Sequence, residues 1–343
     1  MTTLFSFGLG VGTNNQKGEW LEVFYPQPLL NPSPAIAKAV AQVLGYSEGN
    51  QAIALDNSKL EPLAKALDDA GEAEQAAIAR SFEHAKRPLV ATVLASDAAA
   101  SSVPEAYLKL HLISHRLAKP HGVDLSGIFG CLPNVAWTNQ GAIDLEELPE
   151  RQLQARLNGE LLEVSCVDKF PKMTNYVVPS GVRIAHTARV RLGAYLGEGT
   201  TIMHEGFVNF NAGTEGPGMI EGRISAGVMV GAGSDLGGGC STMGTLSGGG
   251  NIVISVGKES LIGANAGIGI PLGDRCIVES GLYITAGTKC AVLDDTNNVV
   301  DTVKARDLAG KNDLLFRRNS MTGAIECKTN KSAIELNDAL HAN

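Results

Sequence analysis

Aliphatic residues recur every six positions through much of the second half of the chain. The series are Val178–Ile184–Val190–Leu196–Ile202–Val208, Ile224–Val230–Leu236, Val256–Ile262–Ile268 and Leu272–Val278–Ile284. A period of six fits neither an α-helix nor a single alternating strand. It predicts a solenoid in which short strands are joined by tight corners and each aliphatic side chain points inward.

Three such faces would close one coil of about 18 residues, and successive coils would stack about 4.8 Å apart. More than half of the 40 glycines fall between Gly193 and Gly287, which suits corners because glycine tolerates a positive φ. We predict that residues 209–219 and 246–251 are insertions. Insertions in repeat proteins form loops and are commonly functional.

The first 170 residues lack this period and indicate a different module. We predict the following elements there: a helix that starts after Ser33-Pro34 and stops at Gly45, a helix capped by Ser58 and Glu61, a helical segment over 71–85, a buried strand over 88–97, a helix capped by Ser102 and Glu105, and a helix over 145–157 interrupted at Pro149. The chain is therefore divided into an α/β domain (1–170), the solenoid (171–290) and a strand-rich tail (291–343) with a turn at Met321-Thr322-Gly323.

Charge and cysteine content limit the functional classes and the cellular location that we expect for the protein. The net charge of −8 argues against a general nucleic-acid binder, and no apolar run approaches the ~20 residues of a membrane span. The first residues do not resemble a signal peptide. Six cysteines without a CxxC pair indicate reduced thiols rather than a disulfide framework, so we expect a cytoplasmic protein.

Several longer motifs resemble the longer-chain branch of the tetrahydrodipicolinate N-succinyltransferase family. They are MHEGFVNFNAGT (203–214), EGRISAGVMVGAGSDLGGG (221–239), TLSGGG (245–250), GANAGIGIPLGD (263–274), ESGLYITAGT (279–288), VKAR (303–306) and LLFRRNS (314–320). The resemblance implies a mainly β fold built on a left-handed parallel β-helix, with residues 171–290 as the acyltransferase domain. It also implies a homotrimer with active sites between subunits. The implied reaction joins succinyl-CoA, tetrahydrodipicolinate and water to give N-succinyl-2-amino-6-oxopimelate and CoA, in diaminopimelate and lysine biosynthesis.

Glu221 and Arg223 carry the chemistry that this resemblance implies. A carboxylate at Glu221 could take a proton from the attacking amine, or could attack the thioester and form an anhydride. Arg223, two residues on, would share its face and suits a substrate carboxylate. The alternative is a corner ion pair between the two side chains, which would be worth little.

The resemblance also assigns acyl-CoA contacts along the solenoid and the tail. These are Gly238 and Ser241 in the glycine-rich GGGCS run, then Ala264, Glu279, Ser280 and Gly287 along the pantetheine groove, and Lys304, Arg317, Arg318, Asn319 and Ser320 beyond the repeat. Small residues admit an extended chain, and cations suit the CoA phosphates. For most glycines tight corner packing is the alternative, and for the basic run it is a solvated patch.

Histidines and one glutamate raise the question of a metal. His186 and His204 are 18 positions apart, on one face of successive coils, but a catalytic zinc usually takes three ligands. Glu205 matches a family position at the trimer axis that is associated with Mg²⁺. The family has an acidic partner upstream, and Ala188 stands at that position here. A metal is therefore not required by the sequence. His111 and His115 lack the HExxH glutamate and are interpreted as ordinary helix residues.

Three other functions compete with the succinyltransferase. The first is a different acyl-CoA-dependent N- or O-acyltransferase, which often uses a histidine base. The second is a zinc hydratase, which would need no CoA. The third is a non-catalytic trimeric scaffold, which would not explain the presence of the EGR and LLFRRNS motifs.

Overall fold

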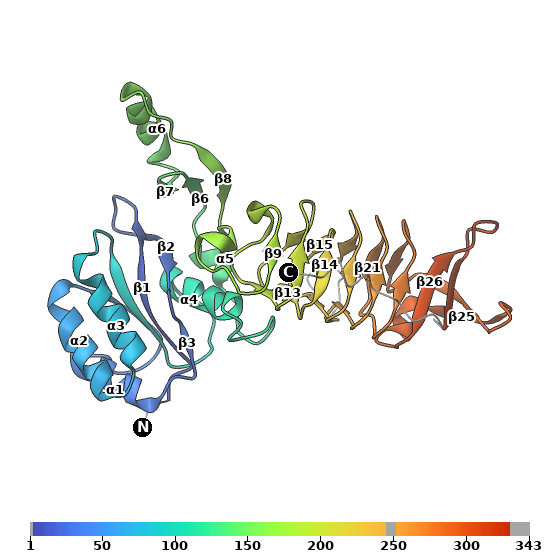
Figure 1. The fold of residues 1–343 in the computed structure, drawn as a ribbon, viewed down its shortest axis with the longest axis horizontal. Coiled ribbons are helices and arrows are strands. Elements are labelled where there is room, and N and C mark those ends of the chain that lie inside the picture. Colours follow the sequence, from blue (N-terminus) through green and yellow to red (C-terminus); the bar gives the residue numbers. More distant parts are fainter. Residues whose placement is uncertain (1–2, 245–251, 330–343) are drawn as a thin grey trace. The chain divides into compact units, whose positions relative to one another are not determined.

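The computed structural model describes residues 3–244 and 252–329, and the chain divides into two compact units. The first unit comprises Met1–Ala118 and Gly122–Pro171, and the second comprises Lys119–His121 and Lys172–Asn343. Strands dominate the structure (Figure 1), and every α-helix of the described residues belongs to the first unit. The protein is therefore mainly β.

An antiparallel sheet forms the centre of the first unit, in the order β2-β1-β5-β4 with β3 beside β1. Its strands are β1 (Ser6–Asn14), β2 (Trp20–Phe24), β3 (Leu29–Leu30), β4 (Gln51–Leu55) and β5 (Leu89–Leu94). Every residue of β5 is buried, which confirms the buried strand predicted there. A strand with neighbours on both edges and helices on both faces has no side left for water.

Helices cover both faces of this sheet. They are α1 (Pro34–Leu44), α2 (Asn57–Asp69), α3 (Ala73–Ser81), followed by the short η1 (Phe82–His84), and α4 (Val103–Ser114). The first three contribute residues such as Ile36, Val40 and Leu63 to one core with Phe7 and Leu9 of β1. Helix α4 lies against the other face, where a Cβ added to Gly8 would meet Leu108.

The helix ends partly confirm the predicted caps. Helix α1 starts at Pro34 and ends at Gly45, whose φ of 69° is left-handed, as predicted. The α2 cap differs, because Asp56 rather than Ser58 accepts the capping hydrogen bond, from the Ser58 amide. At α4 the Ser102 side chain donates to Glu105 instead of accepting from the helix. An ionised carboxylate is the stronger acceptor at an N-terminus.

A smaller part of the first unit carries the helix predicted over 145–157. It consists of α5 (Ile128–Cys131), β6 (Val135–Thr138), β7 (Gly141–Asp144), α6 (Leu148–Leu157) and β8 (Val164–Asp168), with the sheet order β7-β6-β8. Pro149 does not interrupt the helix but stands in its first turn. That prediction was wrong because a first-turn proline loses no intrahelical hydrogen bond.

Three parallel sheets form the solenoid of the second unit, and each coil passes through them in the order A, B, C (Figure 1). Face A contains β10 (Ala194–Leu196), β13 (Ala212–Thr214), β16 (Met229–Val230) and β19 (Ser255–Val256). Face B contains β9 (Arg183–Ile184), β11 (Thr200–Ile202), β14 (Gly218–Ile220), β17 (Asp235–Leu236), β20 (Leu261–Ile262) and β22 (Ile277–Val278). Face C contains β12 (Phe207–Val208), β15 (Arg223–Ile224), β18 (Ser241–Thr242), β21 (Gly267–Gly269) and β23 (Tyr283–Thr285).

The six-residue period places its aliphatic residues inside this solenoid from Val190 onward. Val190, Leu196, Ile202 and Val208 are fully buried, as are the later members Ile224, Leu236, Ile262, Val278 and Ile284. Val178 does not follow the pattern, because it is 70% exposed. It precedes β9, the first strand of the stack, so no coil covers it.

The predicted insertion at 209–219 is wrong, and the break in period lies elsewhere. Ile202 pairs with Ile220, a regular 18 positions on, so β13 and β14 occupy the supposed loop. Ile220 pairs with Leu236, only 16 positions on. The corner between β14 and β15 is therefore two residues short, and it contains Glu221. A shortened corner and an added loop both interrupt a repeat, which is why the sequence did not distinguish them.

A longer coil follows in the next turn. Val230 pairs with Val256, which is 26 positions on instead of 18. The insertion predicted over 246–251 lies outside the described residues. Beyond β23 the tail forms β24 (Lys289–Leu293), β25 (Val299–Lys304), η4 (Ala305–Leu308), β26 (Leu314–Arg318) and β27 (Ile325–Thr329), which extend face B. Strands predominate in the tail as far as residue 329, and the predicted turn precedes Ala324, with Gly323 at a φ of 73°.

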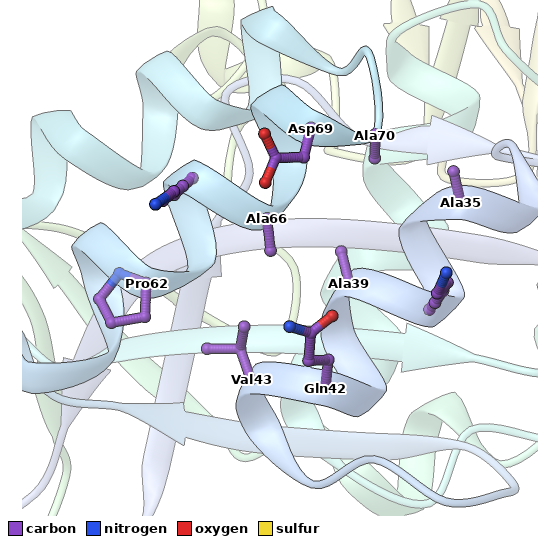
Figure 2. A pocket seen from close by; sticks show the side chains of 10 residues that line it. Ala35, Ala39, Gln42, Val43, Pro62, Ala66, Asp69 and Ala70 are labelled. Carbon is purple, nitrogen blue, oxygen red and sulfur yellow. The ribbon is translucent and has the colours of Figure 1, made fainter.

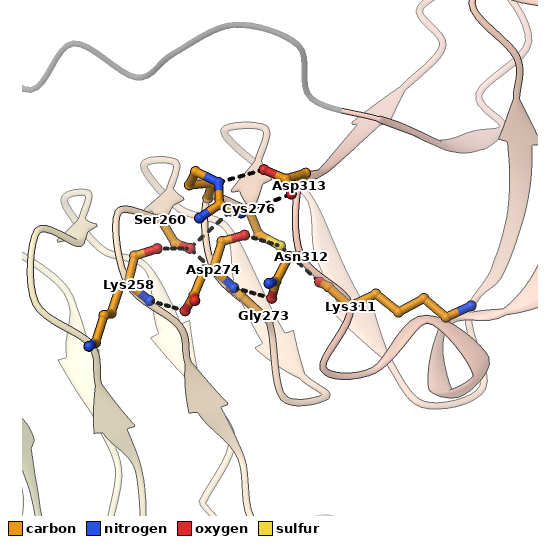
Figure 3. A network of polar contacts seen from close by, with 9 residues as sticks. Lys258, Ser260, Gly273, Asp274, Cys276, Lys311, Asn312 and Asp313 are labelled. Carbon is orange, nitrogen blue, oxygen red and sulfur yellow. Dashed lines mark hydrogen bonds and ion pairs between the residues drawn. The ribbon is translucent and has the colours of Figure 1, made fainter.

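Side chains link neighbouring coils at the corner between faces A and B, here called the A–B corner (Figure 3). Asp274 accepts a hydrogen bond from the Lys258 amide at 2.8 Å, and Asn312 accepts one from the Asp274 amide at 2.8 Å. Arg275 donates twice to Asp313, at 2.6 and 2.9 Å. Each link joins residues of adjacent coils, so this corner is bonded along its length.

A second row of links runs inside the A–B corner. The Ser260 amide donates to the Ser234 hydroxyl, and the Cys276 amide donates to the Ser260 hydroxyl, both at 2.9 Å. The Cys276 thiol in turn faces the Lys311 carbonyl at 3.3 Å. Ser234, Ser260 and Cys276 are fully buried, so these hydroxyls satisfy amides that water cannot reach.

Candidate functional site

Six of the predicted site residues fall on one line along the solenoid. The corners between faces B and C stack in the order 203–206, 221–222, 237–240, 263–266 and 279–282. These positions, here called the B–C column, contain Glu205, Glu221, Gly238, Ala264, Glu279 and Ser280. Residues far apart in sequence are thus brought to one edge of the coil, with one residue group every 4.8 Å or so.

Glu221 occupies the two-residue corner and faces the next coil. Its amide donates to the Leu236 carbonyl at 2.8 Å, which fixes the backbone. A Cβ added to Gly238 would lie 3.4 Å from Glu221 Oε2, so the carboxylate extends over Gly238. Within residues 3–244 and 252–329 the Glu221 carboxylate has no hydrogen-bond or ion-pair partner. It is half-buried and remains available to a substrate.

Arg223 starts the strand that follows and is exposed. Its register partners are Phe207 on one side and Ser241 on the other, so Arg223 and Ser241 point outward from neighbouring strands of face C. No ion pair joins Arg223 to Glu221 among the described residues. The interpretation of these two side chains as a corner ion pair is therefore not what the structure shows.

Cys240 lies behind this pair and was not predicted as a site residue. Its carbonyl accepts from the Arg223 amide at 2.9 Å, and its sulfur fills the place where a Cβ on Gly222 would stand, 2.2 Å away. Burial raises the pKa of the Cys240 thiol to about 12; Arg223 lowers it and Glu221 raises it by smaller amounts. The Cys240 thiol therefore stays protonated at neutral pH. Its only sequence signal was its place in the GGGCS run.

The next two coils continue the column with small and exposed residues. The Asn265 amide donates to the Gly238 carbonyl, and the Gly281 amide donates to the Ala264 carbonyl, at 2.9 and 2.8 Å. A Cβ added to Gly263 would meet Ser280 within 2.8 Å. Ala264 and Ser280 are both exposed. These coils therefore present the small side chains of Ala264 and Ser280 at the surface of the B–C column.

Glu279 bonds to the tail. Its Oε2 accepts the Arg318 amide at 2.7 Å, and its own amide donates to the Phe316 carbonyl at 3.0 Å. β26 therefore adds one more step to the column and places Arg318 at its end. Because the Glu279 carboxylate accepts this backbone hydrogen bond, it is not free to face an anionic cosubstrate. The same contact fixes the position of the basic run.

The four residues of the RRNS run play different parts. Arg317 Nε donates to Glu326 Oε2 at 2.8 Å and Asn319 Nδ2 donates to Glu326 Oε1 at 2.7 Å. Asn319 also accepts from the amides of the turn after β26. These contacts fold the β26–β27 hairpin. Arg318 and Ser320 are exposed, so they are the members of the run that a ligand can reach.

Gly287 and Lys304 do not join the column. They lie near the start of the β24–β25 hairpin, where Lys289 is paired with Lys304 and the Ala305 amide donates to the Thr288 carbonyl. Gly287 is exposed and no atom lies within 4 Å of an added Cβ, so its position is open. The structure thus separates these two residues from the other predicted contacts.

The histidines near the start of the column are close to one another. The rings of His186 and His204 meet edge to face with centroids 5.3 Å apart, and His204 Nδ1 lies 2.9 Å from Glu205 Oε1. Arg189 donates to the Glu205 carbonyl at 2.8 Å. Among the described residues no group of three or more His, Cys, Asp or Glu side chains is placed to hold a metal ion.

His111 belongs to the core, which confirms its interpretation as an ordinary helix residue. It is fully buried on α4, with Nδ1 donating to the Tyr107 carbonyl at 2.7 Å and Nε2 accepting from the Tyr25 amide at 3.3 Å. Burial lowers the pKa of His111 to about 3. His115, one turn on, stacks against it with centroids 6.0 Å apart.

A groove of the first unit lies between α1 and α2 (Figure 2) and holds none of the predicted residues. Its volume is about 780 Å³, and its lining includes Ala39, Gln42 and Val43 of α1 and Ala66 and Asp69 of α2. A groove of this size can hold a small ligand. Its polar lining residues are Lys38, Gln42, Lys65 and Asp69, and none of them belongs to the family motifs, whereas the B–C column brings several motif residues together.

Comparisons with known proteins agree with the motifs. The family profile described as "Tetrahydrodipicolinate N-succinyltransferase middle" matches residues 132–172, and the one described as "Hexapeptide repeat of succinyl-transferase" matches residues 253–286. A 2,3,4,5-tetrahydropyridine-2,6-dicarboxylate N-succinyltransferase from Pseudomonas putida is 74% identical over 340 residues, covering 99% of this chain and 98% of that protein. The protein of the same description from Vibrio cholerae is 62% identical and covers 99% of each chain.

A solved structure is similar over nearly the whole chain. It is described as a 2,3,4,5-tetrahydropyridine-2-carboxylate N-succinyltransferase from Campylobacter jejuni and shares 32% identity with a TM-score of 0.89. The match covers 98% of this chain and 94% of that one. Both parts of the present structure therefore occur together in that protein.

Proposed function

The chain belongs to the tetrahydrodipicolinate N-succinyltransferase family, and from this premise we propose that the B–C column is its active site. The protein is an acyl-CoA-dependent enzyme that transfers succinyl from succinyl-CoA to the amino group of open-chain tetrahydrodipicolinate. Water is consumed in ring opening, and the products are N-succinyl-2-amino-6-oxopimelate and CoA. The reaction belongs to diaminopimelate and lysine biosynthesis.

One observation carries the proposed site: Glu221 and Arg223 stand together at the shortened corner without pairing to each other. The Glu221 carboxylate is half-buried there and has no hydrogen-bond or ion-pair partner among the described residues, so it is available to a substrate. Arg223 offers a fork of donors that suits the free carboxylate of a succinyl group or of the dicarboxylate acceptor. The pair therefore supplies one group for proton or acyl transfer and one for substrate orientation.

Two routes for Glu221 are consistent with this geometry. As a general base it takes a proton from the amine while the nitrogen attacks the thioester carbon, the C–S bond breaks and CoA leaves as a thiolate that is then protonated. As a nucleophile it attacks the same carbon first, releasing CoA and leaving a mixed anhydride that the amine then opens. Both require the carboxylate to be ionised and next to the thioester.

The acyl donor extends from this corner toward the tail in our proposal. Gly238, Ser241, Ala264 and Ser280 leave room for the arm of CoA, and Arg318 receives its phosphates about four strand spacings, or roughly 19 Å, from Glu221. Glu279, Arg317 and Asn319 hold that end of the site in place through the contacts described above. Gly287, Lys304 and Ser320 are further candidates for the nucleotide end.

The assembly and the division of the chain are also proposals. We infer a left-handed coil and a homotrimer, supported by the hexapeptide repeat and by the likeness to the Campylobacter jejuni structure. Residues 171–290 would carry the reaction, preceded in the chain by the 1–170 domain and followed by the 291–343 tail. Glu205, whose carboxylate lies beside His204, stays the candidate Mg²⁺ ligand, since three symmetry-related copies would meet at the trimer axis; the transfer reaction itself is proposed without this ion.

The cellular setting is the last part of the proposal. All six cysteines are free, which suits a reducing compartment and supports a cytoplasmic location. In the described part of the chain, no helix has the length and apolarity needed to cross a membrane.

The test of the site follows thiol release from succinyl-CoA, with and without L-2-aminopimelate as a stable open-chain acceptor. We expect release that depends on the acceptor, and release from acetyl-CoA that is much slower. Equal rates with acetyl-CoA would point to a broader acyltransferase. No release from either donor in folded protein would remove the proposed reaction.

A rapid-mixing version separates the two routes for Glu221. Without acceptor, the anhydride route releases one thiol per active chain in a burst, whereas the base route releases none. Glu221→Gln serves as the blank, because it lacks the carboxylate in either scheme.

A further inference from the structure

The outer surface of β21 has no side chains of its own. Ile268 points inward and is fully buried, while the two outward positions of this strand are Gly267 and Gly269. Neighbouring coils fill both spaces. A Cβ on Gly267 would lie 2.1 Å from Tyr283 Cε2, and a Cβ on Gly269 would lie 2.6 Å from Met243 Sδ. The Tyr283 ring and the Met243 thioether therefore both lie over the outer side of β21, one from each neighbouring coil.

This arrangement forms a small apolar surface, here called the Tyr283–Met243 pad. Tyr283 is 44% exposed, so its ring is not part of the core, which Ile284 already fills. Two glycines in one strand weaken it, and their usual reason is the close approach of another group. Here that group is an aromatic ring held against the backbone. A ring fixed before binding loses little conformational freedom when a ligand covers it.

The pad continues the row of face C that contains Arg223. The outward register runs from Phe207 to Arg223, Ser241, Gly267 and Tyr283. Gly267 is two strand spacings from Arg223, or about 10 Å. The adjacent part of the B–C column holds Ala264 and Ser280, and Arg318 follows one step beyond Glu279. The pad thus lies between the reacting corner and the cationic end.

We propose that the Tyr283–Met243 pad receives the uncharged pantetheine arm of the CoA thioester. This inference rests on the proposed function, because it assumes that the thioester lies at Glu221 and the phosphates at Arg318. The arm is the uncharged link between those two ends, and it needs contact area rather than ions. An exposed aromatic ring beside a thioether supplies polarisable apolar area at that position.

Two substitutions disturb the pad by independent means. Tyr283→Ala removes the ring, and Gly267→Ala displaces it, since the clash is with the far end of a side chain. Tyr283→Phe keeps the ring. The matched control is Tyr195→Ala, on face A, where the tyrosine is also outward and half-buried.

The measurement is the dissociation constant of CoA by calorimetry, with KM and kcat for succinyl-CoA beside it. We expect Tyr283→Ala and Gly267→Ala to raise the dissociation constant and KM about tenfold, with kcat within twofold. Tyr283→Phe and Tyr195→Ala should stay within twofold of the parent protein. Unchanged CoA affinity in both pad variants would overturn the proposal even if the enzyme turns over succinyl-CoA normally.

Two further readouts distinguish contact with the pantetheine arm from contact with the adenine ring or with a neighbouring subunit. Inhibition by pantetheine should weaken in Tyr283→Ala, while inhibition by adenosine 3′,5′-bisphosphate should not; the reverse would assign the pad to the adenine ring and contradict the arm. Light scattering reports the assembly, and a loss of oligomer mass in Tyr283→Ala with normal CoA affinity would make the pad a subunit contact instead. A parent protein that binds CoA but transfers no succinyl group would remove the proposed function without deciding against the pad.

Discussion

Asp274 at the A–B corner accepts a hydrogen bond from the preceding coil, whereas the Glu221 carboxylate at the B–C corner, on the same solenoid, has no partner among the described residues. The A–B corner is bonded from Ser234 to Lys311 by hydroxyls, a thiol and Asx side chains. The B–C column instead combines small residues with polar groups that face outward. The A–B corner uses its side chains to hold coils together, and in our proposal the B–C column keeps the Glu221 carboxylate for a ligand.

This difference predicts that, in a repeat with three similar corners, one corner contributes mainly to stability and another mainly to activity. Substitutions at the A–B corner should change the free energy of unfolding and leave the kinetics alone. Substitutions in the B–C column should do the opposite. Matched residues at the two corners allow both expectations to be tested.

The largest effect is expected at Glu221. Glu221→Gln keeps the shape of the side chain but removes the charge, so kcat should fall by about 10²–10⁴-fold. Because the carboxylate has no partner among the described residues to lose, the melting temperature should stay within about 2 °C and CoA should still bind. Near-normal turnover would contradict the role of Glu221, and a large loss of stability would show that this corner is structural after all.

A pair of glycines gives the next contrast. Gly257→Ala at the A–B corner would place a Cβ 2.3 Å from the Gly273 backbone, which cannot move aside. We expect a loss on the order of 3 kcal/mol in the free energy of unfolding, at the upper end for overpacking. Gly238→Ala meets only Glu221 Oε2, at 3.4 Å.

Gly238→Ala should therefore lower the turnover rate severalfold while unfolding changes by less than about 0.5 kcal/mol. Urea unfolding and steady-state kinetics on both variants decide the matter. Equal losses of stability would break the contrast between the two corners.

Two serines give a smaller version of the same comparison. Ser260→Ala leaves the buried Cys276 amide without its acceptor, which costs about 1–3 kcal/mol. Its kinetic constants should not change. Ser280→Ala, in the B–C column, is exposed and should leave unfolding unchanged while raising KM for succinyl-CoA about threefold, the effect of one modest hydrogen bond. A shift in KM for Ser260→Ala would argue against the separation.

The smallest expected effect concerns Cys240. Its pKa of about 12 keeps the thiol protonated at neutral pH, mainly because it is buried, and the thiolate is the reactive form. Iodoacetamide at about pH 8 should therefore modify exposed Cys166 and spare Cys240 in the native protein, with activity retained. Peptide mass spectrometry checks this, with the urea-unfolded protein as the positive control for both thiols. Rapid native labelling of Cys240 would mean that the corner behind Glu221 opens.

The solenoid shows how much of the fold could be predicted from the sequence. The six-residue period predicted the inward residues from Val190 to Ile284, and the motifs predicted the family. Sequence reasoning mistook the break near Glu221 for an added loop, because Thr214 is polar at a period position and Ile224 follows Ile220 after four positions instead of six. Gly287 and Lys304, which the motifs grouped with the other acyl-CoA contacts, lie outside the B–C column of the same chain, and their role stays a prediction.

The sequence by itself determined the repeat, the family and the identity of the proposed reacting carboxylate, because period and motif are properties of neighbouring residues. Only the tertiary structure decided which residues share a corner. The contacts of Glu221 with Gly238, of Glu279 with Arg318 and of Tyr283 with Gly267 depend on coil lengths of 16, 18 or 26 residues. A two-residue change in one coil moves every later residue to a new position, so these contacts are fixed by register rather than by any local pattern.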